Sequence, residues 1–296
     1  MEKNQQILSV YRSSSERIDH YLSQLFQWSR SEVKALIKAN MVTCNQRLVK
    51  PAHLVSTGDE IFVKMPDKLE KTVPIATVSN DTINTHDWMI PIIYSDDHLL
   101  IVNKPAGLIV HDAPTLSEPS LVDILIAAKI PLFSDDLDRP GIVHRLDQFT
   151  EGLLILVKSA ASFNGLRQQF KDRQVKKHYY TVLQGVLTDK EGVIDRPIGR
   201  DKRVRARQSC HHYVDGTEKS ALTRFNVLHQ FTNLSFVDVD LVTGRTHQIR
   251  VHFSALNCPV LGDFLYSKQS KKAEGYYLQS YYLEFKHPVT NDIMKF

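Results

Sequence analysis

Apolar residues recur at helical spacing near the N-terminus of the chain. Ile18, Leu22 and Leu25 are three or four positions apart, which predicts an amphipathic helix over residues 18–26. Residues 1–14, which precede this helix, are mainly polar. We therefore expect a lead-in without secondary structure of its own, followed by the ordered part of the protein.

A second amphipathic helix is predicted directly after the first, with Ser29 or Ser31 as its N-terminal cap. The apolar residues expected on its inner face are Val33, Leu36 and Ile37. Basic residues recur every fourth position on the opposite face, namely Arg30, Lys34 and Lys38. Such a row is typical of a solvated helix face, and equally of a surface that contacts nucleic-acid phosphates.

Two alternating segments follow the helices. Residues 42–49 predict a strand, a turn and a second strand, and residues 58–63 predict a turn that enters another strand. Two helices and a small sheet within residues 15–63 would form a compact α/β module. Residues 64–90 have weak periodicity and several prolines, so they are predicted to be a linker with room for one strand near residues 73–78.

The remaining segment, residues 91–296, is richer in strands than in helices. Its predicted strands are at 92–94, 99–103, 108–110, 153–157, 175–183, 219–228, 234–242 and 276–285. Ser120 and Ser159 are the expected N-terminal caps of two helices. Many strands with few intervening helices predict an α+β domain with a mixed, largely antiparallel sheet.

Composition and charge place the chain among ordinary globular proteins. It has 296 residues, of which 42% are hydrophobic and 24% are charged. Lys and Arg total 37 against 33 for Asp and Glu, and the sequence pI is about 8.8. This mildly basic balance permits a polyanionic partner without requiring one.

Cysteine usage and hydropathy bear on metal binding and on the cellular compartment in which the protein is expected. The three cysteines, Cys44, Cys210 and Cys258, are too far apart for a disulfide framework or a metal-ligand spacing. Cys210 is followed by His211 and His212, but adjacent ligands without a second spaced pair do not predict a zinc site. No apolar run reaches the roughly 18 residues of a membrane span, and the N-terminus lacks the apolar core of a signal peptide. We expect a cytoplasmic protein with no membrane partner and no bound metal.

A polar tetrad precedes the apolar run at 153–157, and it reads His144-Arg145-Leu146-Asp147. Loops at the edge of a sheet often carry chemistry, which makes Asp147 a candidate reactive carboxylate. The alternative is that Asp147 only caps a turn and pairs with Arg145. Further along, alternation leaves Tyr179 on the same strand face as its apolar neighbours, where it could equally be a core aromatic.

Two further polar clusters are candidates for binding or catalysis. Residues 199–207 lack apolar periodicity and carry five cations, which suit a mobile loop that contacts phosphates or a merely solvated loop: Arg200, Lys202, Arg203, Arg205 and Arg207. Residues 243–253 predict a helix capped by Thr246, with Ile249 and Phe253 inward. Arg250 in its first turn could pair with Asp147 and hold that carboxylate ionised, although a purely structural ion pair would give the same sequence.

The N-terminal module resembles the alpha-L RNA-binding motif. The matching segments, in order, are Glu16-Arg17-Ile18-Asp19, Ser29-Arg30-Ser31, Val42-Thr43-Cys44-Asn45 and Gly58-Asp59-Glu60-Ile61. Asn40 stands where the motif usually has glycine, and asparagine also tolerates a left-handed backbone. The resemblance implies that this module binds RNA and that its basic helix takes part.

The rest of the chain closely resembles RluA-type pseudouridine synthases. The matching positions are the tetrad at 144–147 with Thr150 and Gly152, Asn103-Lys104-Pro105-Ala106-Gly107, Tyr179, Pro197-Ile198-Gly199-Arg200, Gly244-Arg245-Thr246-His247-Gln248-Ile249-Arg250, and the ending at 278–288. The resemblance implies the pseudouridine synthase fold. It also implies isomerisation of uridine in RNA, in which the bond from C1′ to N1 is replaced by one from C1′ to C5. Because no atom is gained or lost, no cofactor is expected.

The resemblance assigns roles to particular residues. Asp147 matches the essential carboxylate, acting as a nucleophile or as the group that starts glycosidic cleavage. Arg250 matches its ion-pair partner, and Tyr179 matches the aromatic that lies against the base. The target base must leave its stack, and Arg145 matches the residue that fills the vacated space or contacts phosphate. Glu151 departs from the small residue usual after Thr150, and we expect its side chain to point away from Asp147.

The implied partner is RNA, with large-subunit ribosomal RNA favoured over transfer RNA by the accessory module. A monomer is the default expectation. The competing interpretation is a non-catalytic RNA-binding or ribosome-assembly protein that keeps the synthase fold. The joint presence of Asp147, Tyr179 and Arg250 favours the enzyme.

Overall fold

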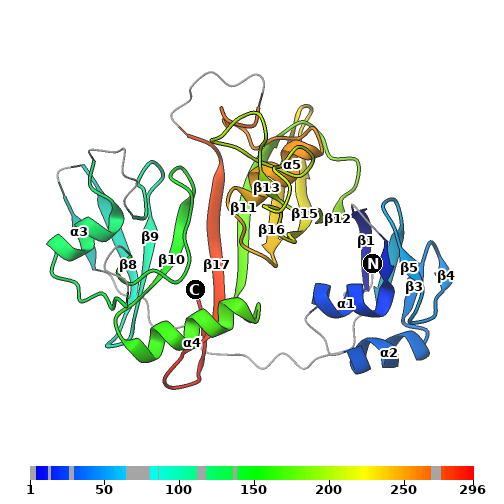
Figure 1. The fold of residues 1–296 in the computed structure, drawn as a ribbon, viewed down its shortest axis with the longest axis horizontal. Helices are drawn as coiled ribbons and strands as arrows, with labels where there is room; N and C mark the ends of the chain where they lie inside the picture. The colour runs from blue at the N-terminus through cyan, green and yellow to red at the C-terminus, as the bar shows by residue number, and fades with distance from the viewer. Residues whose placement is uncertain are drawn as a thin grey trace. The chain divides into compact units, whose positions relative to one another are not determined.

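A computed structural model describes residues 5–12, 15–26, 30–64, 81–85, 87–111, 118–135, 139–267 and 275–296 (Figure 1). The chain forms two compact units. The first unit joins Met1–Lys71 to Leu183–Pro259, and the second joins Thr72–Val182 to Val260–Phe296. Across the described ranges, no helix is both long enough and apolar enough to cross a membrane.

The first unit contains two short helices at its N-terminus, one later helix and eleven strands within its described residues. They are β1 (Gln5–Arg12), β2 (Glu16–Arg17), α1 (Ile18–Phe26), α2 (Arg30–Lys38), β3 (Val42–Cys44), β4 (Arg47–Leu48), β5 (Leu54–Val55), β6 (Glu60–Lys64), β12 (Glu191–Asp195), β13 (Gly199–Arg200), β14 (Gln208–Ser209), β15 (Leu222–Gln230), β16 (Leu234–Leu241) and α5 (Gln248–Ala255). Its main sheet has the order β4-β3-β6-β1-β12-β15-β16. β1 and β12 are parallel, and the other neighbours are antiparallel.

The N-terminal segment corrects one expectation from the sequence. Residues 5–12 form strand β1 and are not an unstructured lead-in. β1 is held on both sides, because it pairs with β6 through Ser9↔Glu60 and with β12 through Val10↔Val193. Polar composition was a poor guide for residues 5–12. A strand with partners on both edges is stabilised by its backbone hydrogen bonds, whatever the polarity of its side chains.

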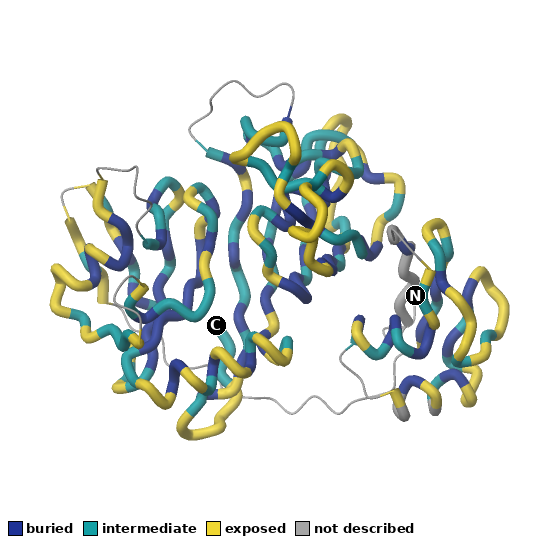
Figure 2. Tube along the Cα trace, viewed as in Figure 1, coloured by how far each residue is buried: buried dark blue, intermediate teal, exposed yellow. Residues whose placement is uncertain are grey.

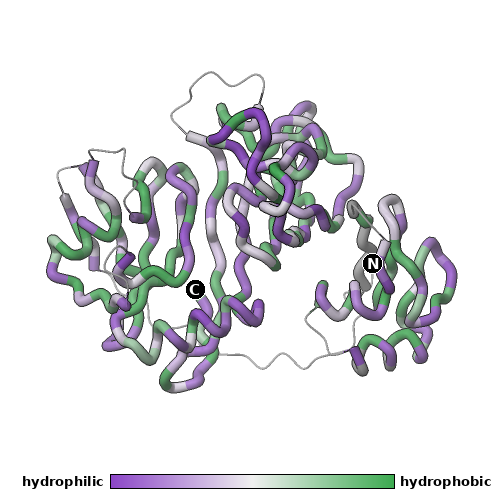
Figure 3. The backbone as a smooth tube through the Cα atoms, viewed as in Figure 1, coloured by the Kyte–Doolittle hydropathy of each residue, from purple (hydrophilic) through white to green (hydrophobic). Residues whose placement is uncertain are grey.

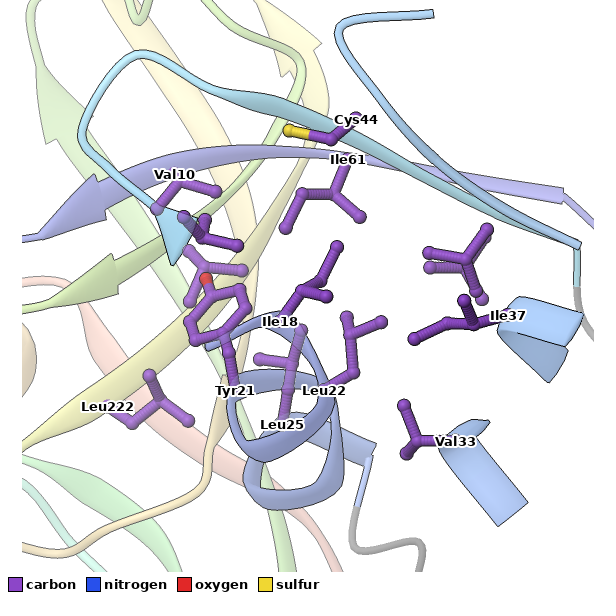
Figure 4. Packing of buried hydrophobic residues seen from close by; sticks show 14 of the residues in the cluster. Val10, Ile18, Tyr21, Leu22, Leu25, Val33, Ile37, Cys44, Ile61 and Leu222 are labelled. Atoms are coloured by element: carbon purple, nitrogen blue, oxygen red, sulfur yellow. The ribbon is translucent and has the colours of Figure 1, made fainter. Parts of the chain in front are cut away.

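One hydrophobic core joins the N-terminal helices to the later strands of this unit. Ile18, Leu22 and Leu25 of α1 are fully buried, as the period predicted. Figure 4 shows these side chains beside Val10 and Leu222, so residues far apart in sequence share the core. Val193 and Val242 belong to the same cluster. The helix pair is therefore packed against strands that come much later in the chain.

The basic face of α2 is exposed, as expected. Val33 and Ile37 are buried and Leu36 is partly buried, whereas the three cations on the opposite face are exposed: Arg30, Lys34 and Lys38. Hydrophobic and hydrophilic colours alternate along this helix in Figure 3. The predicted cap Ser29 lies outside the described residues. Asn40 follows the helix with a φ of 57°, the left-handed conformation that the sequence required there.

The second unit is built on mixed parallel and antiparallel strand pairing. Its elements are β7 (Thr82–Asn84), β8 (Met89–Ser95), β9 (Leu99–Lys104), α3 (Leu121–Ala127), β10 (Glu151–Val157), α4 (Ala160–Lys171), β11 (Lys176–Gln184, whose last two residues belong to the first unit), β17 (Leu278–Lys286) and β18 (Ile293–Lys295). The strand order is β11-β17-β10-β9-β8-β7, with β18 also on β17. β10 and β17 are parallel, whereas β10 with β9 and β11 with β17 are antiparallel. The mixed, largely antiparallel sheet of an α+β fold is thus confirmed.

The middle of this sheet is the most buried part of the unit. Figure 2 draws most of β9 and β10 in dark blue, and Leu99, Ile101, Ile155 and Val157 are fully buried. The helix α4 covers one face through Phe163 and Leu166, which join the same cluster. Its predicted cap Ser159 is confirmed, as is Ser120 for α3, and each forms a capping box.

Two expectations for this unit were wrong in detail. Residues 108–110 do not continue a strand, because the carbonyls of Ile109 and Val110 accept hydrogen bonds from the first N–H groups of α3. The linker predicted at 64–90 ends earlier, since β7 and the start of β8 occupy its last residues. The strand considered at 73–78 lies outside the described residues.

Lys104 at the end of β9 has a fully buried side chain. Its Nζ donates to the carbonyls of Pro105 and Leu108, each at 2.8 Å, and of Gln148 at 2.9 Å. Burial lowers the pKa of Lys104 to about 7, although the charges of Asp147 and Glu151 raise it. The three acceptors match the three N–H donors of an ammonium, so this side chain fixes the loop after β9 to the loop before β10.

The backbone of β10 comes close to that of β17 at Gly152. Gly152 lies between Lys104 of β9 and Ser280 of β17, with a φ of +110°. A Cβ atom at this position would be 2.1 Å from the carbonyl oxygen of Ser280. Both the backbone conformation and the space therefore require glycine.

Replacing Gly152 by alanine should strongly destabilise the protein. We expect urea unfolding to show a loss of about 3 kcal/mol or more, because the sheet must separate to admit the methyl group. Gly58→Ala is the matched control, since Gly58 has a φ of +92° but nothing within 4 Å of its Cβ position. That control isolates the backbone strain of about 1–2 kcal/mol. Equal losses in the two variants would contradict the close approach at Gly152.

Lys104→Met should change how stability depends on pH. Because the pKa of Lys104 is lowered to about 7 in the folded protein, from 10.5 as its ordinary value, the unfolded chain holds the extra proton between these values. Wild-type stability should then rise with pH over this range, relative to the variant, by up to ~1.4 kcal/mol per pH unit. Chemical unfolding at several pH values measures the difference. A difference that stays constant from pH 7 to 10 would show that this lysine is charged when folded.

Candidate active site

Asp147 is held in a tight turn between the tetrad and β10. The backbone N–H of Thr150 donates to the carbonyl of Asp147 at 3.1 Å, which closes the turn. Leu146 beside it is 4% exposed and anchors the loop from within. The carbonyl of Gln148 inside the turn accepts hydrogen bonds from Lys104 Nζ and from the N–H of Gly107, each at 2.9 Å. The backbone around Asp147 is thus fixed from both sides.

His144 has a structural role in this loop. Its Nε2 accepts a hydrogen bond from the backbone N–H of Ile155 at 3.0 Å, and its ring lies 4.9 Å from that of Phe170. Burial, with the charge of Lys177, lowers the pKa of His144 to about 3. The imidazole is therefore neutral at physiological pH, as its acceptor role requires. His144 and the buried Leu146 therefore both shape the loop.

Tyr179 lies close to Asp147 in the second unit. Its side chain is 4% exposed, and a shift of register between His178 and Tyr179 sets it opposite Ser280 of β17. Burial, joined by the charge of Asp147, raises the pKa of Tyr179, and a hydrogen bond with Ser280 opposes the rise. The phenol is therefore neutral at physiological pH. It can contact a base and exchange hydrogen bonds, but it does not supply a phenolate.

Tyr276 also contacts Asp147, and the sequence did not single it out. Its hydroxyl donates to Asp147 Oδ2 at 3.4 Å and lies 3.3 Å from Thr150 Oγ1. In the sequence, Tyr276 is only the first residue of a predicted strand. No spacing in the sequence reveals the contact, because 129 positions separate Tyr276 from Asp147.

Arg250 lies in the first unit, on α5, and its side chain is buried at 4% exposure. The predicted cap Thr246 is wrong, since α5 begins after His247, which has a φ of 57° and forms no side-chain cap. Gln248, the first residue of the helix, instead fixes the turn before it, because its Oε1 accepts from the N–H of Arg245 at 3.0 Å and from Thr243 Oγ1 at 2.8 Å. Ile249 is buried as expected.

A buried polar network then fixes α5 to the sheet of the first unit. Gln248 Nε2 donates to the carbonyl of Leu222 and to Thr223 Oγ1, each at 2.9 Å. His252 Nδ1 lies 2.8 Å from Thr223 Oγ1, and its Nε2 lies 3.0 Å from the carbonyl of Arg196. Burial lowers the pKa of His252 to about 4, so Nε2–H donates to Arg196 and Nδ1 accepts from Thr223. The helix that carries Arg250 is therefore rigidly placed within its unit.

The basic loop at 199–207 forms an ordered hairpin. β13 and β14 pair through Gly199↔Ser209 and Arg200↔Gln208. Asp201 Oδ1 accepts from the N–H groups of Arg203 and Val204 at 2.7 and 2.8 Å. The cations with exposed side chains are Arg200, Lys202, Arg203 and Arg205, and Arg207 is half-buried. The turn therefore displays its charges on a fixed backbone, although the sequence suggested a mobile loop.

The other candidate cations belong to two different units. Arg30 of α2 contacts Asp19, with Nη2 at 3.4 Å from Oδ2, so part of its charge is balanced within the module. Lys34 and Lys38 are exposed on the same helix. Arg145 is exposed in the second unit, two residues before Asp147. The structure thus brings Asp147, Tyr179 and Arg145 into one unit, and it puts Arg250, the hairpin and α2 in the other.

One group of metal-type donors occurs among the described residues, although cysteine spacing predicted none. Donor atoms of Cys44, His53 and Asp59 lie within 4.8 Å of one another. Burial, with the charge of Asp59, raises the pKa of Cys44 to about 11, which disfavours the thiolate that metals bind. The carboxylate of Asp59 already accepts from Asn45 Nδ2 at 2.9 Å and from the N–H of Ser56 at 2.8 Å. These contacts stabilise two turns of the N-terminal module.

Comparison with known families matches both parts of the chain. Residues 98–255 match the RNA pseudouridylate synthase family, and residues 16–61 match the S4 domain. Two solved human structures share the fold. RNA Pseudouridylate Synthase Domain Containing 1 is 27% identical with a TM-score of 0.56, over 70% of this chain and 82% of that one. RNA Pseudouridylate Synthase Domain Containing 4 is 25% identical with a TM-score of 0.54, over 69% and 86%.

Curated relatives extend the match to almost the whole chain. An uncharacterized RNA pseudouridine synthase of Bacillus subtilis, YlyB, is 36% identical over 98% of this chain and 92% of its own length. Ribosomal large subunit pseudouridine synthase D of Nitrosomonas europaea is 33% identical over 94% of this chain and 79% of its own length. With this similarity, and with an aspartate in a clamped turn beside a buried tyrosine, the chain belongs to the RNA pseudouridine synthases, enzymes that isomerise uridine in RNA.

Proposed function

We propose that this pseudouridine synthase modifies uridines of large-subunit ribosomal RNA, and that Asp147 is the carboxylate that begins the reaction. The observation that carries the catalytic assignment is the turn that fixes Asp147 next to the neutral, buried Tyr179. In the reaction, the bond from C1′ to N1 breaks and a bond from C1′ to C5 forms. The hydrogen on C5 leaves, and N1 gains one, so the product is an isomer of the substrate.

The fixed turn suits this chemistry because catalysis by a carboxylate requires a defined approach to the sugar. A carboxylate that attacks C1′ or assists cleavage must lie within contact distance of the reacting atoms and in the right direction. The hydrogen bonds to the backbone of residues 147 and 148 restrict that direction before RNA binds. Tyr179 would lie against the extruded base as a neutral aromatic ring. Arg250 stays the predicted ion-pair partner of Asp147 on the basis of its motif position.

Phosphate contacts would supply most of the RNA affinity. The exposed cations of the hairpin and those of α2 are suitable donors to phosphate oxygens. Their backbones are ordered, so binding would immobilise side chains only. The target base is stacked within the RNA helix, so the base must flip out before Asp147 can reach the sugar. The exposed side chain of Arg145 is suited to fill the space that the base leaves.

The proposed RNA target rests on the relatives. Proteins named ribosomal large subunit pseudouridine synthase D share 32–34% identity with this chain over nearly its full length. The S4 domain supports binding to structured RNA. Action as a monomer in the cytoplasm is part of the same proposal, and the free, buried state of Cys44, Cys210 and Cys258 is consistent with a reducing compartment.

Asp147→Asn should abolish isomerisation while RNA binding persists. We expect activity to fall by about 10⁴-fold or more, because the amide lacks the nucleophilic charge. Pseudouridine mapping in ribosomal RNA from cells lacking the gene, complemented with each variant, measures this. Glu151→Gln is the matched control, since it removes an exposed carboxylate four residues away and should restore modification. Restored modification by Asp147→Asn would overturn the catalytic assignment. Unchanged pseudouridine content in the deletion strain would favour the non-catalytic RNA-binding protein.

Removing cations from the hairpin should reduce the salt dependence of RNA binding. Arg203→Ala and Arg205→Ala each delete a side chain proposed to bind phosphate, so each should lower the slope of log affinity against log salt by about 0.7–0.9. Filter binding at several salt concentrations measures the slope. Lys171→Ala serves as a control, because it removes an exposed cation at the end of α4, outside both proposed RNA surfaces. A hairpin variant with the wild-type slope would show that this hairpin does not contact phosphates.

A further inference from the structure

Tyr276 connects the C-terminal part of the chain to Asp147. It precedes β17, and its side chain is 7% exposed. Its hydroxyl lies 3.4 Å from Asp147 Oδ2 and 3.3 Å from Thr150 Oγ1. Asp147, Thr150 and Tyr276 all belong to the second unit.

The chemistry of these groups sets the direction of their hydrogen bonds. An ionised carboxylate accepts and does not donate, so the single phenolic hydrogen of Tyr276 is directed to Asp147. Thr150 is then the donor to the phenolic oxygen. Because the Tyr276 hydroxyl accepts from Thr150 while it donates to Asp147, its O–H bond is more strongly polarised. This polarisation strengthens the hydrogen bond to the carboxylate. The three groups therefore form an ordered chain that ends on Asp147 Oδ2.

The ring of Tyr276 is fixed by packing. Phe149, inside the Asp147 turn, meets it edge to face at 6.0 Å between ring centroids and meets Phe264 in the same way at 6.2 Å. A Cβ atom at Gly275 would lie 3.4 Å from Phe149, so the backbone there runs close against the same ring. The next residue, Tyr277, donates its backbone N–H to the carbonyl of Leu261 at 3.1 Å. The hydroxyl of Tyr276 is thus presented from a rigid position.

We propose that Tyr276 is a positioning residue for Asp147. This inference rests on the proposed role of Asp147. The backbone turn fixes where the carboxylate starts, but backbone hydrogen bonds alone do not set the rotation about the Cβ–Cγ bond. A hydroxyl held against Oδ2 restricts that rotation and thereby directs the second oxygen, Oδ1. A merely structural Tyr276 would act through its ring, and phenylalanine would replace it without loss.

The test is Tyr276→Phe, which removes one hydroxyl and keeps the ring. We expect kcat for pseudouridine formation on ribosomal RNA from cells lacking the gene to fall about tenfold or more, as for the removal of a hydrogen bond to a charged group. KM, RNA affinity and melting temperature should stay at wild-type values, because the packing is retained. Tyr277→Phe is the matched control. The side chain of Tyr277 is 63% exposed, so removing its hydroxyl should leave kcat unchanged.

A second variant keeps the test decisive if Tyr276→Phe proves unstable. Thr150→Val removes the donor to Tyr276 and should lower kcat by itself, and it should add little in the Tyr276→Phe background. Wild-type kcat in both single variants, or the same loss in Tyr277→Phe, would overturn the proposal. If Asp147→Asn is inactive but Tyr276→Phe is fully active, only the role of Tyr276 fails. If Asp147→Asn is active, the proposed function itself fails.

Discussion

The ordered state of the catalytic loop depends on Lys104. A fully buried amine is costly to desolvate, and this one is retained because three carbonyls meet its three donors. One of those carbonyls belongs to Gln148, next to Asp147. The amine of Lys104 joins the end of β9 to the turn before β10, and it lies close enough to Asp147 for the carboxylate charge to raise its pKa. The motif Lys104-Pro105-Ala106-Gly107 is best understood as the support of the turn that carries the carboxylate.

The surroundings of Asp147 combine fixed geometry with neutral partners. His144 and Tyr179 are both titratable, yet burial lowers the pKa of the first and raises that of the second, so neither carries charge at physiological pH. The carboxylates of Asp147 and Glu151 lie near Lys104, whose amine loses its proton as the pH rises through about 7.

Periodicity predicted much of the fold from the sequence. Helix α1 has the predicted bounds, and β10 follows from its apolar run, because in both cases local burial decides the structure. β1 was missed since its stability comes from pairing with β6 and with β12, and β12 lies nearly two hundred residues later. The cap of α5 was misassigned because the helix begins one residue later than the sequence suggested, after His247 in a left-handed conformation that forms no side-chain cap. Asp147 and Tyr179 were identifiable by motif, but the contact of Tyr276 exists only after the chain folds.

Isomerisation of uridine in ribosomal RNA is the activity on which every proposed residue role depends. Release of tritium from uridine C5 tests it most directly, because that hydrogen must leave when C5 joins C1′. Ribosomal RNA labelled at this position in cells lacking the gene would be incubated with the purified wild-type protein. We predict release that reaches a fixed number of tritium atoms per RNA molecule. Stable binding of the same RNA without any release would contradict the proposed activity.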